Sequence, residues 1–412
     1  MHPSPARTDP FFVLAKPAGP ACNLRCSYCF YLEKKDLFGR AQGTRMQEDT
    51  LEVFVRDYLA AQDTPEVTFG WQGGEPTLRG LDFFRQVVEL QRAYAGGRKV
   101  SNMLQTNGML IDAEWAGFLA ANEFLVGISI DGPEELHDPQ RVDAAGGGTL
   151  ARVLKGLDHL KAAGVEFNTL TVVSRANARH PLKVYRFLKE IGSRHLQFIP
   201  LVERLPKKPG PGVLAGPPVA GSLGNCDVAK WSVSPVGYGD FLVEIFKEWV
   251  RHDVGTVFVQ MFDDAIGSWI GAGASLCVFA ETCGRQVAME HDGSLYACDH
   301  YVYPEYRLGN VKEQSLAQML DSDAQRGFGA AKRDTLPQQC RRCEVRFACN
   351  GGCPKHRFLQ TADGEPGLNY LCAGYRKFFR FVDPSMRAIA RLLHEGRAPA
   401  EIMRGVKVAP RG

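Results

Sequence analysis

Residues 11–31 read FFVLAKPAGPACNLRCSYCFY and place three cysteines, Cys22, Cys26 and Cys29, directly after a β-rich run. An iron–sulfur cubane usually takes four thiolates. Three cysteines spaced C-x3-C-x2-C, with no fourth nearby, therefore predict a cluster with one iron open to another ligand. Open coordination is typical of a catalytic metal site. The alternative is a zinc site completed by a histidine, with His2 and His137 as the nearest candidates.

Further β-rich runs follow this segment as far as residue 202, and amphipathic helical segments lie between them. The later runs begin at Glu66, Val100, Phe124, Glu166 and His195. Six βα units in succession predict an α/β fold whose parallel strands are joined by right-handed crossovers. Periodicity alone does not distinguish an open sheet from a closed or partly closed barrel. In both folds, ligands bind at the carboxyl ends of the strands.

The composition is that of a folded protein. The chain has 412 residues, of which 45% are hydrophobic and 23% are charged, so we expect two or three domains. The balance of 49 basic against 46 acidic residues favours neither a nucleic-acid nor a membrane partner. The N-terminus lacks the apolar core of a signal peptide, and no apolar run approaches membrane-spanning length. These features predict a cytoplasmic location.

The twelve cysteines are clustered along the chain. Disulfide scaffolds are short and secreted, so clustered thiols in a long chain indicate metal ligands instead. Eight of them lie between Cys277 and Cys372, enough for two complete sites of four thiolates, although zinc ribbons remain an alternative for this spacing. Cys226 is left over as a free thiol.

We expect four regions along the chain. Residues 1–235 form the βα core. Within it, the Pro/Gly-rich composition near 205–235 predicts a long surface loop. A helical bridge follows at 236–270, then a small cysteine-rich domain at 271–376. A C-terminal helix and tail occupy 377–412.

Several motifs resemble known families. The C-x3-C-x2-C spacing followed by Phe30 and Tyr31 resembles the signature of the radical S-adenosylmethionine (SAM) superfamily, and GGEP at residues 73–76 resembles its motif for the SAM amino group. The later cysteine spacing resembles the SPASM extension of peptide-modifying radical SAM enzymes. QTNGMLID, LVGISIDGPEELHD and CDHYVYPEYRLGN, among other stretches, narrow the resemblance to anaerobic sulfatase-maturating enzymes.

This resemblance implies a partial (β/α)6 radical SAM barrel followed by the SPASM domain and a C-terminal helix. It implies that a 5′-deoxyadenosyl radical oxidises a cysteine or serine of a sulfatase motif to Cα-formylglycine under anaerobic conditions. The implied cofactors are SAM and three [4Fe–4S] clusters, one that binds SAM and two that are auxiliary. The implied partners are an unfolded or nascent sulfatase polypeptide and an electron donor such as flavodoxin or ferredoxin. Another SPASM peptide-modifying enzyme, forming a thioether or crosslink, is the alternative.

The resemblance also implies roles for individual residues. The SAM-binding cluster takes Cys22, Cys26 and Cys29. One auxiliary cluster takes Cys277, Cys283, Cys298 and Cys353, and the other takes Cys340, Cys343, Cys349 and Cys372. SAM contacts fall on Tyr28, Gly73, Gly74, Glu75, Ser129, Arg141 and Val202. Tyr31 and Gln72 correspond to substrate contacts, and Asp299 corresponds to the general base. Pro139 and Gln140 depart from the family, which more often has a tyrosine there.

Overall fold

The computed structural model describes residues 10–29, 31, 45–207, 216 and 226–405. Most of the predicted Pro/Gly-rich loop, and His2, lie outside the described residues. The chain divides into two compact units. The first unit comprises residues 1–129, 140–167 and 282–331, and the second comprises 130–139, 168–281 and 332–412.

The first unit contains a mixed sheet in the order β12-β11-β10-β1-β2-β3-β4. Its strands are β1 (Phe12–Ala15), β2 (Glu66–Trp71), β3 (Lys99–Thr106), β4 (Leu125–Ser129), β10 (Gln286–Met289), β11 (Ser294–Tyr296) and β12 (Arg307–Asn310). Strands β1 to β4 pair in parallel, and β1 also pairs in parallel with β10, with Phe12 opposite Gln286. β11 and β12 extend the sheet as antiparallel neighbours. The sequence did not predict that β1 pairs with a strand of the cysteine-rich region.

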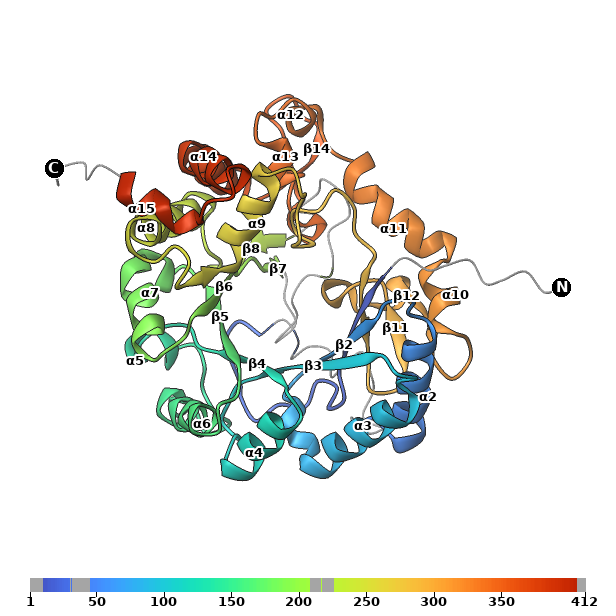
Figure 1. Cartoon of the computed structure of the whole chain (residues 1–412). Helices are drawn as coiled ribbons and strands as arrows, with labels where there is room; N and C mark the ends of the chain where they lie inside the picture. The colour runs from blue at the N-terminus through green and yellow to red at the C-terminus, as the bar shows by residue number, and fades with distance from the viewer. Residues whose placement is uncertain (1–9, 30, 32–44, 208–215, 217–225, 406–412) are drawn as a thin grey trace. The chain divides into compact units, whose positions relative to one another are not determined.

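Amphipathic helices follow the strands of this unit. They are α2 (Glu48–Ala60), α3 (Leu81–Tyr94), α4 (Ala113–Ala121), α6 (Leu150–Ala162), α10 (Leu316–Leu320) and α11 (Asp323–Asp334), the last of which runs into the second unit. In Figure 1, α2, α3 and α4 lie along the outer side of β2, β3 and β4. α3 buries Phe84, Val87 and Val88 at helical spacing, because one apolar stripe of a surface helix must face the sheet.

The second unit contains the last predicted strands, β5 (Phe167–Val173) and β6 (His195–Pro200), which pair in parallel, and β9 (Phe258–Val259) pairs in parallel with β6. All six predicted strands are thus confirmed. Short antiparallel pairs are β7 (Arg204–Pro206) with β8 (Cys226–Val228), and β13 (Leu359–Gln360) with β14 (Pro366–Leu368). The helices are α5 (Glu134–His137), α7 (Pro181–Glu190), α8 (Pro235–His252), α9 (Gln260–Trp269), α12 (Gln338–Arg341), α13 (Arg346–Cys349), α14 (Cys372–His394) and α15 (Ile402–Gly405).

The C-terminal helix α14 begins before the predicted boundary at residue 377. It starts at Cys372 and continues through Pro384, and it packs against α8 (Figure 1). Tyr375, Phe378 and Phe379 are buried in its first half, so this packing stabilises a helix that a proline would otherwise interrupt. The predicted cluster ligand Cys372 therefore stands at a helix terminus.

Short 3-10 turns complete both units. They are η1 (Pro76–Arg79), η2 (Asn177–Arg179), η3 (Asp299–Tyr301), η4 (Pro304–Tyr306), η5 (Pro354–His356) and η6 (Pro399–Glu401). None of the described helices is long and apolar enough to span a membrane.

Candidate functional site

The three-cysteine loop follows β1 and is held by local hydrogen bonds. The backbone N–H of Cys29 donates to the carbonyl of Cys26 at 3.1 Å, and the N–H of Leu24 donates to Sγ of Cys22 at 3.3 Å. Burial raises the pKa of Cys22 to about 12, so this thiol is neutral until a metal ion replaces its proton. The hydroxyl of Ser27 donates to Oε1 of Gln140 at 2.6 Å. Gln140, which departs from the family pattern, therefore stabilises the three-cysteine loop through Ser27.

The glycine turn after β2 lies directly against this loop. The N–H of Gly74 donates to the carbonyl of Gly19, and the N–H of Glu75 donates to that of Ala21, both at 2.8 Å. A Cβ at residue 74 would lie 2.0 Å from the Ala21 carbonyl oxygen, which no side chain tolerates. Gly73 has a φ of +133°, a backbone conformation that favours glycine. Both glycines are required for this close approach.

Glu75, a predicted SAM contact, has a carboxylate that accepts four hydrogen bonds from the protein itself. It accepts from the N–H of Thr77 at 3.0 Å and from the hydroxyls of Thr77 and Thr106 at 2.6 and 2.8 Å. It also accepts from the N–H of Asn107 at 2.8 Å. Burial raises the pKa of Glu75. The side chain thus fixes the glycine turn to the end of β3.

Asn107 extends this network to the cysteine loop. Its amide Nδ2 donates to Oδ1 of Asn23 at 2.7 Å and lies 3.9 Å from Sγ of Cys22. Sequence reasoning did not single out Asn107, although it belongs to the QTNG motif that supported the resemblance. The sequence signal available for Asn107 was its position directly after β3, the strand that pairs with β2.

Most of the other predicted SAM contacts also lie in the first unit. The guanidinium of Arg141 lies 5.7 Å from the ring centroid of Tyr28, and both residues are buried. The hydroxyl of Ser129, at the end of β4, accepts from Nε2 of Gln105 at 3.1 Å. Val202 is buried in the second unit.

Asp299, the predicted base, begins η3 directly after Cys298. Its carboxylate forms an ion pair with the ammonium of Lys16, which is 1% exposed. That ammonium also lies 3.8 Å from the ring centroid of Tyr31, whose hydroxyl donates to the buried carboxylate of Glu290. Neither Lys16 nor Glu290 was a sequence candidate, because an isolated charged residue carries no spacing signal.

Gln72, the other predicted substrate contact, ends β2 beside β1. Its N–H donates to the carbonyl of Ala15 at 2.9 Å. Its side-chain Oε1 is buried and has no hydrogen-bond partner among the described residues. Because buried polar atoms are normally paired, this oxygen is suited to accept from a bound peptide.

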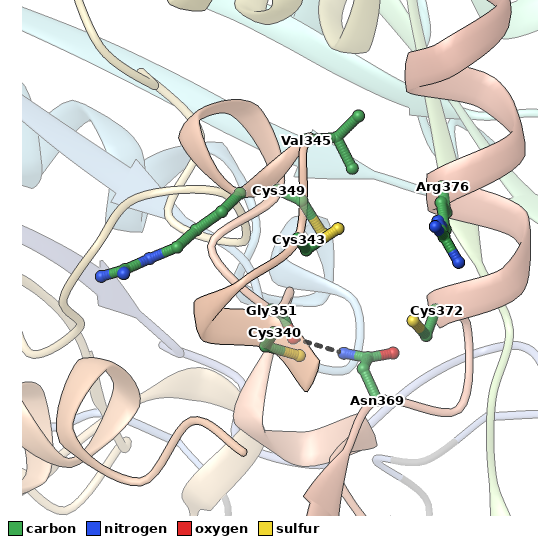
Figure 2. A pocket seen from close by; sticks show the side chains of 9 residues that line it. Cys340, Cys343, Val345, Cys349, Gly351, Asn369, Cys372 and Arg376 are labelled. Atoms are coloured by element: carbon green, nitrogen blue, oxygen red, sulfur yellow. Dashed lines mark hydrogen bonds between the residues drawn. The ribbon is translucent and has the colours of Figure 1, made fainter. Parts of the chain in front are cut away.

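Four predicted auxiliary-cluster ligands line one hollow in the second unit. Figure 2 shows Cys340, Cys343, Cys349 and Cys372 around this hollow, whose empty volume is about 360 Å³ with open solvent included. Burial raises the pKa of Cys349 to about 12 and that of Cys372 to about 11. Three of the thiols lie within residues 340–349 and the fourth begins α14. Together they match the donor set of a [4Fe–4S] cluster.

Backbone geometry shapes this hollow. Asn350 has a left-handed backbone conformation with a φ of 43°, and the following Gly351 has a φ of 72°. The amide Nδ2 of Asn369 donates to the carbonyl of Gly351 at 3.1 Å (Figure 2). Arg376, on the first turns of α14, also lines the hollow. The chain therefore turns sharply after Cys349 and presents a guanidinium beside the thiols.

The other four predicted ligands fall in both units. Cys283 and Cys298 belong to the first unit, and Cys277 and Cys353 belong to the second, so their grouping remains a prediction. The segment before Cys277 is anchored within its own unit, because Oδ1 of Asp264 accepts from the N–H groups of Ser275 and Leu276 at 2.6 and 2.7 Å.

His137, the described histidine of the zinc alternative, ends α5. Its Nδ1 accepts from the backbone N–H of Asp131 at 3.2 Å. It belongs to the second unit, whereas Cys22, Cys26 and Cys29 belong to the first.

Comparisons with known proteins match both expected regions. Residues 17–188 match the radical SAM superfamily, and residues 277–344 match the SPASM iron–sulfur cluster-binding domain. The chain is therefore a radical SAM enzyme with a SPASM domain. This confirms the predicted fold class and the use of SAM and [4Fe–4S] clusters.

Full-length relatives define the family further. The serine-type anaerobic sulfatase-maturating enzyme of Bacteroides thetaiotaomicron is 45% identical over 97% of this chain and 95% of its own length. The cysteine-type enzyme of Clostridium perfringens is 35% identical over 92% of this chain and 98% of its own. The structure of native anSMEcpe with bound AdoMet and Cp18Cys peptide has a TM-score of 0.81 and 34% identity, covering 93% of this chain and 99% of that one. The chain belongs to the family of anaerobic sulfatase-maturating enzymes.

Proposed function

We propose that this enzyme oxidises a serine or cysteine in the active-site motif of a sulfatase to Cα-formylglycine under anaerobic conditions. The observation that carries the proposal is the three-cysteine loop laid on the Gly74 turn, in the same unit as the ion pair between Lys16 and Asp299. The first feature suits a cluster with an open iron, and the second holds a partly exposed carboxylate that could accept a proton.

The cofactors would be held by residues of this chain. Cys22, Cys26 and Cys29 would hold the SAM-binding cluster. The proposed SAM contacts are Tyr28, Gly73, Gly74, Glu75, Ser129, Arg141 and Val202. When bound, SAM and the clusters supply hydrogen-atom abstraction from Cβ of the target residue and an acceptor for the second electron. The close packing of Gly74 on Ala21 fixes the cysteine loop beside the glycine turn, and Arg141 can bind a carboxylate through two parallel hydrogen bonds.

The protein's own groups then handle the peptide and its proton. Asp299 would accept the proton from the hydroxyl or thiol of the target residue. Loss of this proton would accompany transfer of the second electron to a cluster, so that one hydrogen atom, one proton and one electron leave the target residue. The carboxylate is 23% exposed, so it is accessible to a ligand. Gln72 would bind the peptide backbone through its unpartnered Oε1, and Tyr31 would support the substrate from beside Lys16.

The most specific substrate proposal concerns the target residue. Identity is 45% to a serine-type enzyme and 35% to a cysteine-type enzyme, which favours a serine-containing sulfatase motif. The natural substrate would be a nascent or unfolded sulfatase polypeptide in the cytoplasm. The reducing electron would come from a donor such as flavodoxin or ferredoxin.

The test is anaerobic reconstitution with iron, sulfide, SAM and reductant, followed by incubation with matched serine and cysteine peptides. Mass spectrometry should detect the formylglycine product from the serine peptide together with 5′-deoxyadenosine. A thioether or crosslinked product, or 5′-deoxyadenosine without any formylglycine from either peptide, would contradict the proposal. The same peptides with alanine at the target position serve as the control.

A further inference from the structure

Lys16 is a buried cation at the end of the first strand. Its backbone N–H donates to the carbonyl of Met289 at 2.9 Å, so the residue is fixed between β1 and β10. Its side chain is 1% exposed. Burying an ammonium is unfavourable unless it is paired and hydrogen-bonded. Its contacts should therefore define its role.

Those contacts are two residues of the proposed substrate site. The ammonium forms an ion pair with the carboxylate of Asp299. It also lies 3.8 Å from the ring centroid of Tyr31, within the range of a cation–π interaction. One cation therefore touches both the proposed base and a proposed peptide contact. A change in the position of the ammonium would move both.

The far edge of Tyr31 is fixed as well. Its hydroxyl donates to the carboxylate of Glu290, which is 0% exposed. The ring is thus held between Lys16 on its face and Glu290 at its hydroxyl.

We infer that Lys16 is a positioning residue that holds the Asp299 carboxylate and the Tyr31 ring in the geometry needed for proton removal from the substrate. The inference rests on the proposed function of Asp299. Lys16 acts through Asp299 and Tyr31, so its loss should affect the use of the radical more than its formation. Misplacing a reacting group by about 1 Å can cost about 100-fold in rate.

The experiment compares Lys16→Met, Asp299→Asn and the double variant. Formylglycine and 5′-deoxyadenosine are measured in the same reactions, after iron content and circular dichroism have confirmed folding. Lys16→Met should lower the formylglycine formed per 5′-deoxyadenosine by about 10- to 100-fold. In the Asp299→Asn background the same change should add less than about twofold, because groups that act as a unit are not additive. Lys99→Met, at a 65% exposed lysine of β3, is the matched control.

A second measurement does not depend on turnover. Binding of a fluorescently labelled serine peptide should weaken several-fold in Lys16→Met, because the Tyr31 ring loses the cation on its face. If Lys16→Met does not fold, Lys16→Arg is used, since it retains the charge but not the position of the nitrogen. It should also lower the product ratio.

The outcomes separate the two proposals. A product ratio equal to that of the wild type in a folded Lys16 variant, with Asp299→Asn defective, overturns the positioning role alone. The positioning role is also overturned if the fold losses of Lys16→Met and Asp299→Asn multiply fully in the double variant. Absence of formylglycine with the wild-type enzyme overturns the proposed function itself.

Discussion

Lys16 and Asp299 form an ion pair although 283 positions separate them in the sequence. Lys16 is buried, whereas the carboxylate of Asp299 is partly exposed. The carboxylate therefore has one side fixed by the protein and another accessible to a ligand. This arrangement suits a base that must be aimed before a substrate binds.

Asp299→Asn tests the proposed base. Asparagine keeps the shape of the side chain but cannot accept the proton, and a general base contributes about 10²–10⁴-fold in rate. Formylglycine formation should fall by that order while iron content and SAM binding stay near wild type. Quantitative mass spectrometry of the peptide product provides the measurement. Near-normal product formation would point instead to His300 or Tyr301.

Replacement of Cys22, Cys26 and Cys29 by alanine should remove one cluster and all SAM cleavage. The wild-type protein should hold about twelve irons, four for each of three cubanes, and the variant about eight. Iron and sulfide analysis under strictly anaerobic conditions gives the count, and chromatography gives 5′-deoxyadenosine. Continued formation of 5′-deoxyadenosine by the triple variant would exclude this loop as the radical-generating site.

Gly74→Ala should displace the cysteine loop, because the added methyl would lie 2.0 Å from the carbonyl oxygen of Ala21. We expect loss of the SAM-binding cluster and of SAM affinity, with iron reduced toward eight per chain. Gly117→Ala in α4 is the matched control, since its methyl would meet no atom within 4 Å. That variant should bind SAM normally and gain up to about 1 kcal/mol in helix stability. Normal SAM affinity in Gly74→Ala would refute the packing argument.

Cys349→Ala should remove the cluster held in the hollow of Figure 2 and also destabilise the second unit. Metal binding and local folding are coupled in small cysteine-rich lobes. Iron should fall by about four per chain, and limited proteolysis should cut the variant faster than the wild type. Cys226→Ala, at the thiol outside all three predicted ligand sets, is the control and should retain all its iron.

Asp263 gives a pH-dependent prediction, because burial raises its pKa to about 6 from the ordinary 3.8. The folded state then binds the proton more tightly than the unfolded state, so the free energy of unfolding falls as the pH rises from about 4 to 6. Asparagine does not ionise, so the Asp263→Asn variant does not lose this free energy of unfolding. The Tm of the variant should therefore exceed that of the wild type by more at pH 8 than at pH 5. Asp158→Asn, at an exposed carboxylate, should show no such difference.

The strand pattern and the cysteine spacing were readable from the sequence because both are local. Alternating β-rich and helical segments predicted six strands, and all six are present. The start of α14 at Cys372 was not readable, because Pro384 interrupts the local helical signal and packing against α8 restores it. The hydrogen bonds of the Glu75 carboxylate were not readable either, because Thr106 and Asn107, at the end of the neighbouring strand, donate to it.

The sequence by itself determined which residue types are available for cluster ligation, since ligands such as Cys22, Cys26 and Cys29 act at short separations along one loop. Only the tertiary structure decided which distant side chains meet. The parallel pairing of β1 with β10, with Ala15 opposite Met289, brings the segment after β1 beside the segment after β10. Glu290 directly follows β10 and accepts from Tyr31. Asp299 follows β11, the antiparallel neighbour of β10, and forms its ion pair with Lys16. A lone lysine or glutamate carries no local signal, because its partner is chosen by strand pairing rather than by spacing.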